Sequence, residues 1–233
     1  MFFSPERLMA LRRMILSESE SNRRDALNGL VDFQLDDYAA LFEIMQGKPV
    51  CIRLFDPPLH EFLPATRSGQ RELAEALGLP VSDVARRIEA MEEYNPMLGL
   101  RGVRLGVTVP EIYDMQARAI FEAALMASSD GAPVVPEIMI PLVSAKREVE
   151  LVKGRIDAVA AAVRAQHGAA IDFRLGVMVE TPRACLRAAE FSPFTSFLSF
   201  GTNDLTQMAY GLSRDDAGRF MSDYVNQGVF PED

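Results

Sequence analysis

Asn203 and Asp204 stand where an apolar segment, residues 197–200, is followed by Gly201 and Thr202. This pattern predicts a strand that passes through a short turn into the start of a helix. Free backbone N–H groups at a helix start favour an anion, and the carboxylate of Asp204 is a ligand that hard cations prefer. The segment therefore predicts a site for a metal-bound small molecule that carries a phosphate or a carboxylate.

Arg53 and Glu180 lie towards or just past the ends of two more predicted strands, residues 50–55 and 173–179. In barrels built from alternating strands and helices, the reactive groups come from the C-terminal ends of the strands. We therefore expect Arg53, Glu180 and the Asn203-Asp204 pair to converge on one mouth of the barrel.

Each of these residues also has a purely structural interpretation, which the sequence leaves open. Arg53 could pair with the nearby Asp56 on the surface. Glu180 could supply negative charge near the N-terminus of the helix that follows it. Asn203 and Asp204 could do no more than cap a helix.

The composition excludes several classes of protein. The 233 residues are 48% hydrophobic and 24% charged, and the formal net charge of −9 argues against nucleic-acid binding, which needs a basic face. No apolar stretch approaches the ~20 residues of a membrane span, and the first residues lack the basic and apolar regions of a secretory leader. Cys51 and Cys185 are the two cysteines, so we expect no disulfide framework and a cytoplasmic location.

Apolar periodicity divides the rest of the chain into helices and strands. Strands are predicted at 50–55, 134–143, 173–179 and 197–200, and helices from residue 5, over 36–45, 70–77, 84–91, 110–126 and 149–163, and from residue 182. We expect a polar loop at 17–22 and a helix cap at Asp36. The Gly-rich segment 95–107 is harder to assign, with at most a fifth strand at 99–107.

The alternation of strands and helices favours parallel pairing, and its closed form is a (β/α)8 TIM-type barrel. A full barrel needs eight strands, whereas this sequence predicts four or five. We therefore predict a single domain, residues 1–233, that forms an incomplete barrel. Strand edges left unpaired by such a barrel would promote oligomerisation.

Six motifs carry a resemblance to a known family: residues 52–62, 95–105, 136–142, 178–183, 199–208 and 213–218. With them, the chain resembles the phosphoenolpyruvate/pyruvate-binding C-terminal barrel of the pyruvate phosphate dikinase family, a relative of phosphoenolpyruvate synthase and of enzyme I of the sugar phosphotransferase system. The Asp-Pro-Pro-Leu-His-Glu-Phe and Ser-Arg-Asp-Asp-Ala-Gly segments favour the dikinase over its relatives. One departure is Leu100, where the family usually has a histidine.

The resemblance implies a function and a role for each candidate residue. The reaction would be Mg²⁺-dependent phosphoryl transfer between a phosphohistidine and pyruvate, which forms phosphoenolpyruvate. The implied roles are metal ligation by Glu180 and Asp204, catalytic contact with the phosphoryl group by Arg53 and Arg101, substrate-carboxylate binding by Gly201, Thr202 and Asn203, and a phosphate contact from Arg214.

The resemblance also implies partners and missing parts. The partners are the phosphohistidine domain of a longer enzyme and a second copy in a homodimer. The family's barrel begins with a strand that carries a further phosphate-binding arginine, and its last strands carry the cysteine thought to protonate the enolate; neither strand is found in this sequence. We therefore expect the chain alone to be inactive. The alternatives are a non-catalytic fragment for substrate binding or dimerisation, and the equivalent domain of phosphoenolpyruvate synthase.

Overall fold

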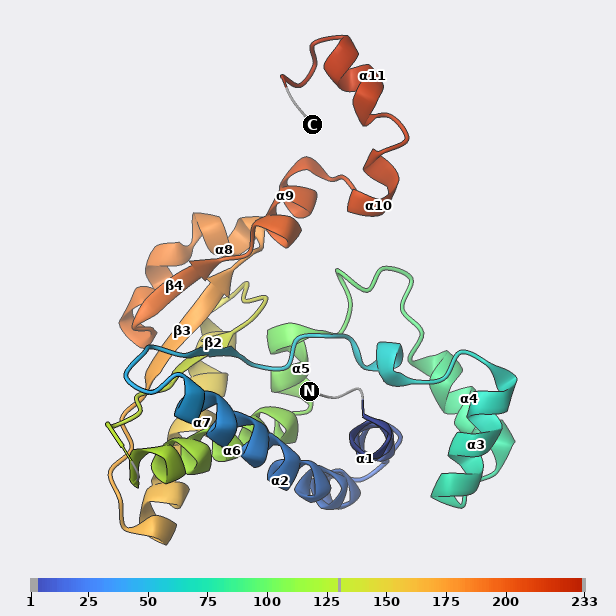
Figure 1. Ribbon diagram of the computed structural model, residues 1–233. Helices are drawn as coiled ribbons and strands as arrows, with labels where there is room; N and C mark the ends of the chain where they lie inside the picture. The colour runs from blue at the N-terminus through green and yellow to red at the C-terminus, as the bar shows by residue number, and fades with distance from the viewer. Residues whose placement is uncertain (1–3, 130, 232–233) are drawn as a thin grey trace.

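The computed structural model describes residues 4–129 and 131–231, and a parallel sheet of four strands organises them (Figure 1). Its strands are β1 (Cys51–Arg53), β2 (Glu137–Ile140), β3 (Arg174–Val179) and β4 (Phe197–Phe200), and they pair in the order β1-β2-β3-β4. All three pairings are parallel, which confirms the predicted α/β class and all four predicted strands. Four strands are half of a (β/α)8 barrel, so its closure stays a prediction.

Most of the described chain is helical. The helices are α1 (Pro5–Ile15), α2 (Glu20–Ile44), α3 (Arg67–Leu77), α4 (Val81–Ala90), α5 (Gly102–Thr108), α6 (Glu111–Ser129), α7 (Lys146–His167), α8 (Pro182–Leu186), α9 (Thr202–Tyr210), α10 (Arg214–Ala217) and α11 (Met221–Asn226), with a short 3-10 turn η1 at Leu59–Phe62. Within the described ranges, no helix is both long and apolar enough to cross a bilayer. Both cysteines are free thiols.

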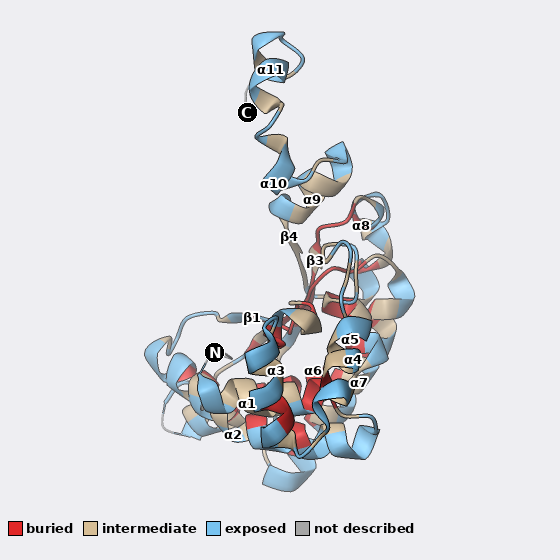
Figure 2. Cartoon of the chain, turned by 90° about the vertical axis from the view of Figure 1, so that its right-hand side faces the viewer, coloured by how far each residue is buried: buried red, intermediate tan, exposed pale blue. Residues whose placement is uncertain are grey.

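The core lies between the sheet and the helices α2, α6 and α7, and it makes up most of the buried part of the molecule (Figure 2). Helix α2 packs against α6 and α1, and α6 packs against α7. On α2, buried side chains recur every three or four residues, as a helix with one face in the core requires: Ala26, Leu27, Leu30, Gln34, Tyr38 and Phe42. This layer fixes the frame on which the strand ends are held.

Two predictions near the N-terminus need correction. Helix α1 begins at Pro5, as predicted, but the polar loop expected over 17–22 ends at Ser19. The Ser19 hydroxyl accepts a hydrogen bond from the Asn22 N–H at 3.1 Å and caps a single helix that runs to Ile44. Asp36 is therefore in the interior of α2 and does not cap a helix.

The possible fifth strand over 99–107 is wrong, because residues from Gly102 form helix α5. Val103, Leu105 and Val107 alternate as they would in a strand, which made the segment ambiguous. In the structure Val103 and Leu105 are fully buried, whereas Val107 is 38% exposed.

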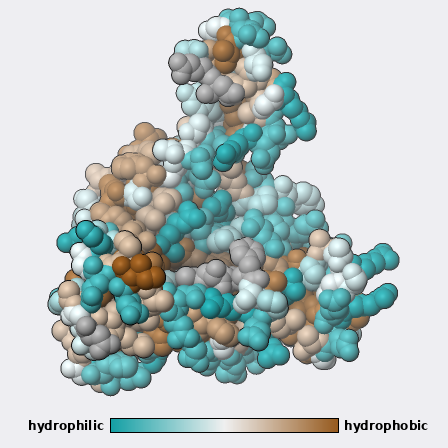
Figure 3. Space-filling model, in the orientation of Figure 1, coloured by the Kyte–Doolittle hydropathy of each residue, from teal (hydrophilic) through white to brown (hydrophobic). Residues whose placement is uncertain are grey.

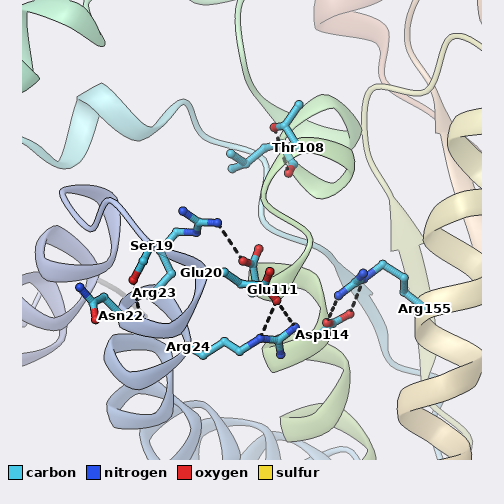
Figure 4. A network of polar contacts seen from close by, with 10 residues as sticks. Ser19, Glu20, Asn22, Arg23, Arg24, Thr108, Glu111, Asp114 and Arg155 are labelled. Carbon is cyan, nitrogen blue, oxygen red and sulfur yellow. Dashed lines mark hydrogen bonds and ion pairs between the residues drawn. The ribbon is translucent and has the colours of Figure 1, made fainter.

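Charged pairs fix helix α6 between its neighbours (Figure 4). Arg23 on α2 donates to the carboxylate of Glu111 at 3.0 Å, and Glu111 is only 2% exposed. On the other side of α6, Arg155 of α7 donates to Asp114 at 2.9 Å. Removal of one partner from a buried pair leaves an uncompensated charge, so the Arg23–Glu111 contact resists displacement of α6.

Helices α9, α10 and α11 stand off from the rest of the molecule (Figure 1). None of the described residues from 201 to 231 is buried. In the space-filling view, hydrophilic residues cover much of the hollow between this part and the body (Figure 3). The candidate site lies where these helices meet the ends of the strands.

Candidate active site

Glu180 follows the last residue of β3 and is only 3% exposed. Its Oε1 accepts a hydrogen bond of 2.6 Å from the backbone N–H of Leu142, which lies just past the end of β2. Leu142 is fully buried and has a φ of 59°, a conformation that costs a non-glycine residue energy. Thr181 caps α8, so Glu180 also lies next to the N-terminus of that helix, where the structural alternative places its negative charge.

The pKa of Glu180 is raised to about 7, chiefly by burial and to a smaller extent by the carboxylates of Asp56 and Asp204, while the Leu142 N–H and Arg53 oppose the shift. Three carboxylates, those of Glu180, Asp56 and Asp204, face two guanidinium groups, those of Arg53 and Arg101, so negative charge is in excess here. A cation near Glu180 would offset that excess.

Asp204 lies in the first turn of α9, whose N-cap residue is Gly201. A Cβ atom on Gly201 would lie 2.6 Å from Glu180 Cβ and 3.0 Å from Met178 Sδ, so the ends of β3 and β4 approach each other closely. The N-cap supplies no side-chain hydrogen bond to this helix. The two predicted metal ligands therefore come from neighbouring strand ends on the same edge of the sheet.

Arg101 links Asp204 to a second carboxylate. Its Nη2 lies 2.5 Å from Asp56 Oδ2 and 3.4 Å from Asp204 Oδ2, and its side chain is 15% exposed. Burial alone would lower the pKa of Arg101, but the carboxylates of Asp56, Asp204 and Glu180 raise it above its ordinary value. Arg53 is more open, with its Nη1 3.7 Å from Asp56 Oδ2 and its side chain 48% exposed.

From the sequence, Asp56 is expected only as a possible surface partner of Arg53, whereas the structure buries it to 4% exposure between Arg53 and Arg101. Its Oδ1 is buried and has no hydrogen-bond partner among the described residues. Buried carboxylates need partners, so Asp56 is part of the site's charge arrangement. Its position directly after the predicted strand 50–55 and its place in the Asp-Pro-Pro-Leu-His-Glu-Phe motif were the available signals.

Helix α6 holds the backbone that carries Asp56. The Phe55 N–H donates to Gln116 Oε1 at 2.7 Å, and the Phe55 carbonyl accepts from the Tyr113 hydroxyl at 3.0 Å. All of these atoms are buried, and burial raises the pKa of Tyr113 well above its ordinary value. These bonds engage the peptide units on both sides of Phe55, and they fix the backbone orientation and with it the direction of the next side chain.

Asn203 and Arg214 lie away from this cluster of charges. With Thr202, they line a separate cavity of about 460 Å³ whose apolar walls include Tyr210 and Phe230. Both side chains are exposed, and no hydrogen bond or ion pair among the described residues joins either of them to the buried carboxylates. The structure thus brings Arg53, Arg101, Glu180 and Asp204 together, with Gly201 against Glu180, and leaves Thr202, Asn203 and Arg214 at the rim.

The carboxylates of the site can be compared with the ligands that the predicted Mg²⁺ requires. In residues 4–129 and 131–231, no group of three or more His, Cys, Asp and Glu side chains is arranged to bind a metal. Glu180 and Asp204 offer two carboxylates, the ligand type that Mg²⁺ prefers, and Mg²⁺ usually keeps several water or substrate oxygens. The excess negative charge around Glu180 fits such an ion.

Gly102 allows the strand ends to meet and supplies a first testable prediction. It has a φ of 55°, and a Cβ atom there would lie 2.7 Å from Leu142 Cβ and 2.9 Å from Asp56 Oδ1. We expect Gly102→Ala to lower the free energy of unfolding by about 3 kcal/mol, through backbone strain plus steric overlap. The matched control is Gly78→Ala, which has a φ of 64° and open space around it and should cost about 1 kcal/mol.

Denaturant midpoints of the two alanine variants test this prediction. Equal losses would contradict the close approach of Gly102 to Leu142 and Asp56, because backbone strain alone would then explain both.

Comparison with known proteins gives a consistent result. Residues 2–227 match the family model described as "PEP-utilising enzyme, PEP-binding domain". The chain is 50% identical over 233 residues to a pyruvate, phosphate dikinase of Giardia intestinalis and 51% identical over 234 residues to one of Rhizobium meliloti (strain 1021). All of this chain, but only 26% of each relative, is covered, so the chain spans about a quarter of their length. By the extent of the family match, the chain belongs to the PEP-utilising enzymes and corresponds to their PEP-binding domain.

Proposed function

We propose that this chain is the phosphoenolpyruvate/pyruvate site of a pyruvate, phosphate dikinase, where a phosphoryl group passes between a phosphohistidine and pyruvate in a Mg²⁺-dependent step. The observation that carries the proposal is the buried Glu180 carboxylate, with Asp204 at the neighbouring strand end and Arg101 between carboxylates. The names of the relatives support the reaction class.

The residues present suit the charges that the reaction develops. Mg²⁺ bound by Glu180 and Asp204 would supply a Lewis acid that stabilises negative charge on the enolate oxygen. Arg53, half exposed beside Asp56, is free to turn its planar guanidinium towards phosphoryl oxygens. Arg101 is already oriented by Asp56, so little reorganisation is needed when charge develops near it.

The rim of the site would hold the rest of the substrate. Asn203 and the backbone N–H of Thr202, at the start of α9, suit a carboxylate, whereas the Gly201 N–H donates to the Val179 carbonyl at 3.2 Å. Arg214, at the start of α10, lines the same cavity as Thr202 and Asn203 and would add a phosphate contact there. We also propose that the phosphohistidine domain of a longer enzyme delivers the phosphoryl group here, and that the unpaired edge of β4 takes part in assembly.

Calorimetric titration tests this proposal. We expect phosphoenolpyruvate to bind the chain only when Mg²⁺ is present, because the metal and the arginines must share the charge of the ligand. Asp204→Asn should lower the affinity at least about tenfold, since a metal ligand loses its charge. The matched control is Asp215→Asn on the exposed helix α10, which should bind like the wild type.

Phosphoenolpyruvate binding that does not depend on Mg²⁺, or an affinity that is unchanged in Asp204→Asn, would contradict the proposal. A complete lack of binding in the wild-type chain would favour the alternative of a non-catalytic fragment.

A further inference from the structure

The segment that carries Arg101 is a loop, residues 91–101, between α4 and α5. Most of its backbone hydrogen bonds are local turns, such as Leu98 N–H to Asn95 O at 3.0 Å and Arg101 N–H to Gly99 O at 3.1 Å. Local turns do not fix a loop relative to the rest of a protein. At the end of the loop the Gly102 N–H donates to the Asp56 carbonyl at 3.1 Å, and the segment before Arg101 is held by side chains that bind its peptide groups.

Glu93 is one such side chain. Its Oε1 accepts a hydrogen bond of 2.5 Å from the Leu100 N–H, the peptide next to Arg101. The Glu93 carboxylate lies in close contact with Gly99, and a Cβ atom at residue 99 would overlap the carboxylate. Arg104 holds the same peptide from the other side, because its Nη1 donates to the Gly99 carbonyl at 2.7 Å.

The second oxygen of Glu93 points to His60. Glu93 Oε2 and His60 Nδ1 are 3.9 Å apart, and both atoms are buried without a hydrogen-bond partner among the described residues. A cavity of about 340 Å³, lined by His60, Glu93 and Leu100, gives the imidazole room to close that gap. Closure would satisfy two buried polar atoms at once, which is favourable.

His60 belongs to η1, four residues after Asp56, so the contact links two functional segments. Asp56 and Arg101 already form an ion pair at 2.5 Å. Glu93 and His60 join the same two stretches of chain at a second point. The ion pair and the bond from the Gly102 N–H to the Asp56 carbonyl hold one end of the loop, and a contact at Glu93 would fix the rest of the loop relative to η1.

We propose that Glu93, supported by His60, is a positioning residue that sets Arg101 for its contact with the phosphoryl group. The inference rests on the proposed function for the role of Arg101, but not for the attachment of the loop. Small displacements of a binding group are costly, so loss of this attachment should show in ligand affinity.

Three variants test the inference by calorimetry with phosphoenolpyruvate and Mg²⁺ and by hydrogen exchange of residues 98–101. Glu93→Ala should weaken binding about tenfold and speed exchange of the Leu100 amide. Glu93→Gln keeps an acceptor for that amide and should recover most of both properties. Glu92→Ala, at the exposed neighbouring position, should match the wild type in both.

A histidine pair tests the second half of the arrangement. His60→Ala should weaken binding about threefold, by loss of the support for Glu93 Oε2. His167→Ala is the matched control, because His167 lies at the end of α7 and has a 41% exposed side chain.

If hydrogen exchange of the Leu100 amide were unchanged in Glu93→Ala, the inference would be overturned whether or not phosphoenolpyruvate binds. Faster exchange of this amide with unchanged affinity for phosphoenolpyruvate would also overturn it. A wild-type chain that binds no phosphoenolpyruvate would overturn the proposed function, and the exchange result would then decide the attachment of the loop by Glu93.

Discussion

Arg101→Met is expected to abolish detectable phosphoenolpyruvate binding and to lower the free energy of unfolding by about 2–4 kcal/mol. The guanidinium lies between Asp56 and Asp204, and Asp56 is 4% exposed. Its removal leaves a buried carboxylate with Arg53, at 3.7 Å, as its remaining cationic partner. Ligand binding would fail because the oriented donor for the phosphoryl group is lost.

Two further variants separate the effect on stability from the effect on binding. Asp56→Asn combined with Arg101→Met removes the uncompensated charge, so we expect most of the lost stability to return while binding stays absent. Arg86→Met, which breaks an exposed pair with Asp83, is the matched control and should change stability by less than about 1 kcal/mol. If the double variant were no more stable than Arg101→Met alone, the buried Asp56 charge could not be the cause.

Glu180→Gln is expected to stabilise the metal-free protein and to prevent binding of Mg²⁺. The pKa of Glu180 is raised from 4.5 to about 7, first by burial and then by the carboxylates of Asp56 and Asp204. The folded protein therefore binds a proton at Glu180 more tightly than the unfolded chain does. Between pH 4.5 and 7 the unfolded state releases its proton first, so metal-free stability falls as the pH rises through this window.

The glutamine variant does not titrate there and keeps an acceptor for the Leu142 N–H. With a chelator present, its advantage over the wild type should be small at pH 5 and about 2–3 kcal/mol at pH 8. Chemical denaturation at both pH values measures the difference. The control is Glu89→Gln on the exposed face of α4, for which no pH-dependent advantage is expected. A constant difference between the two pH values for Glu180→Gln would contradict the raised pKa.

The strands and the main site residues could be predicted because local signals and tertiary structure agree. Residues 174–179 form an apolar run that is followed by a capped helix, and the structure places both. The Gly201-Thr202 turn likewise leads into α9. Once strands alternate with helices, their C-terminal ends must lie on one edge, so Glu180 and Asp204 could be placed together from sequence.

Other features depend on contacts that sequence spacing does not reveal. Asp36 has the residue type of a helix cap, but packing of a continuous apolar face on α6 keeps α2 helical through it. The alternation of apolar residues at 103–107 is also typical of a strand. The sequence does not show that Val107 faces solvent, and only the fold does. Asp56 and Glu93 gain their importance from partners 45 and 7 residues away, and such pairings follow from the folded topology.

Replacement of Mg²⁺ by Mn²⁺ allows the most direct measurement of the central claim, that Glu180 and Asp204 bind one divalent ion beside the phosphoryl group. Electron paramagnetic resonance counts bound Mn²⁺, and the relaxation of the phosphorus signal of phosphoenolpyruvate reports its closeness to the ion. We predict one Mn²⁺ per chain, displaced by Mg²⁺ and lost in both Glu180→Gln and Asp204→Asn, with strong phosphorus relaxation in the wild type alone. Retention of the Mn²⁺ site in both variants would contradict the account.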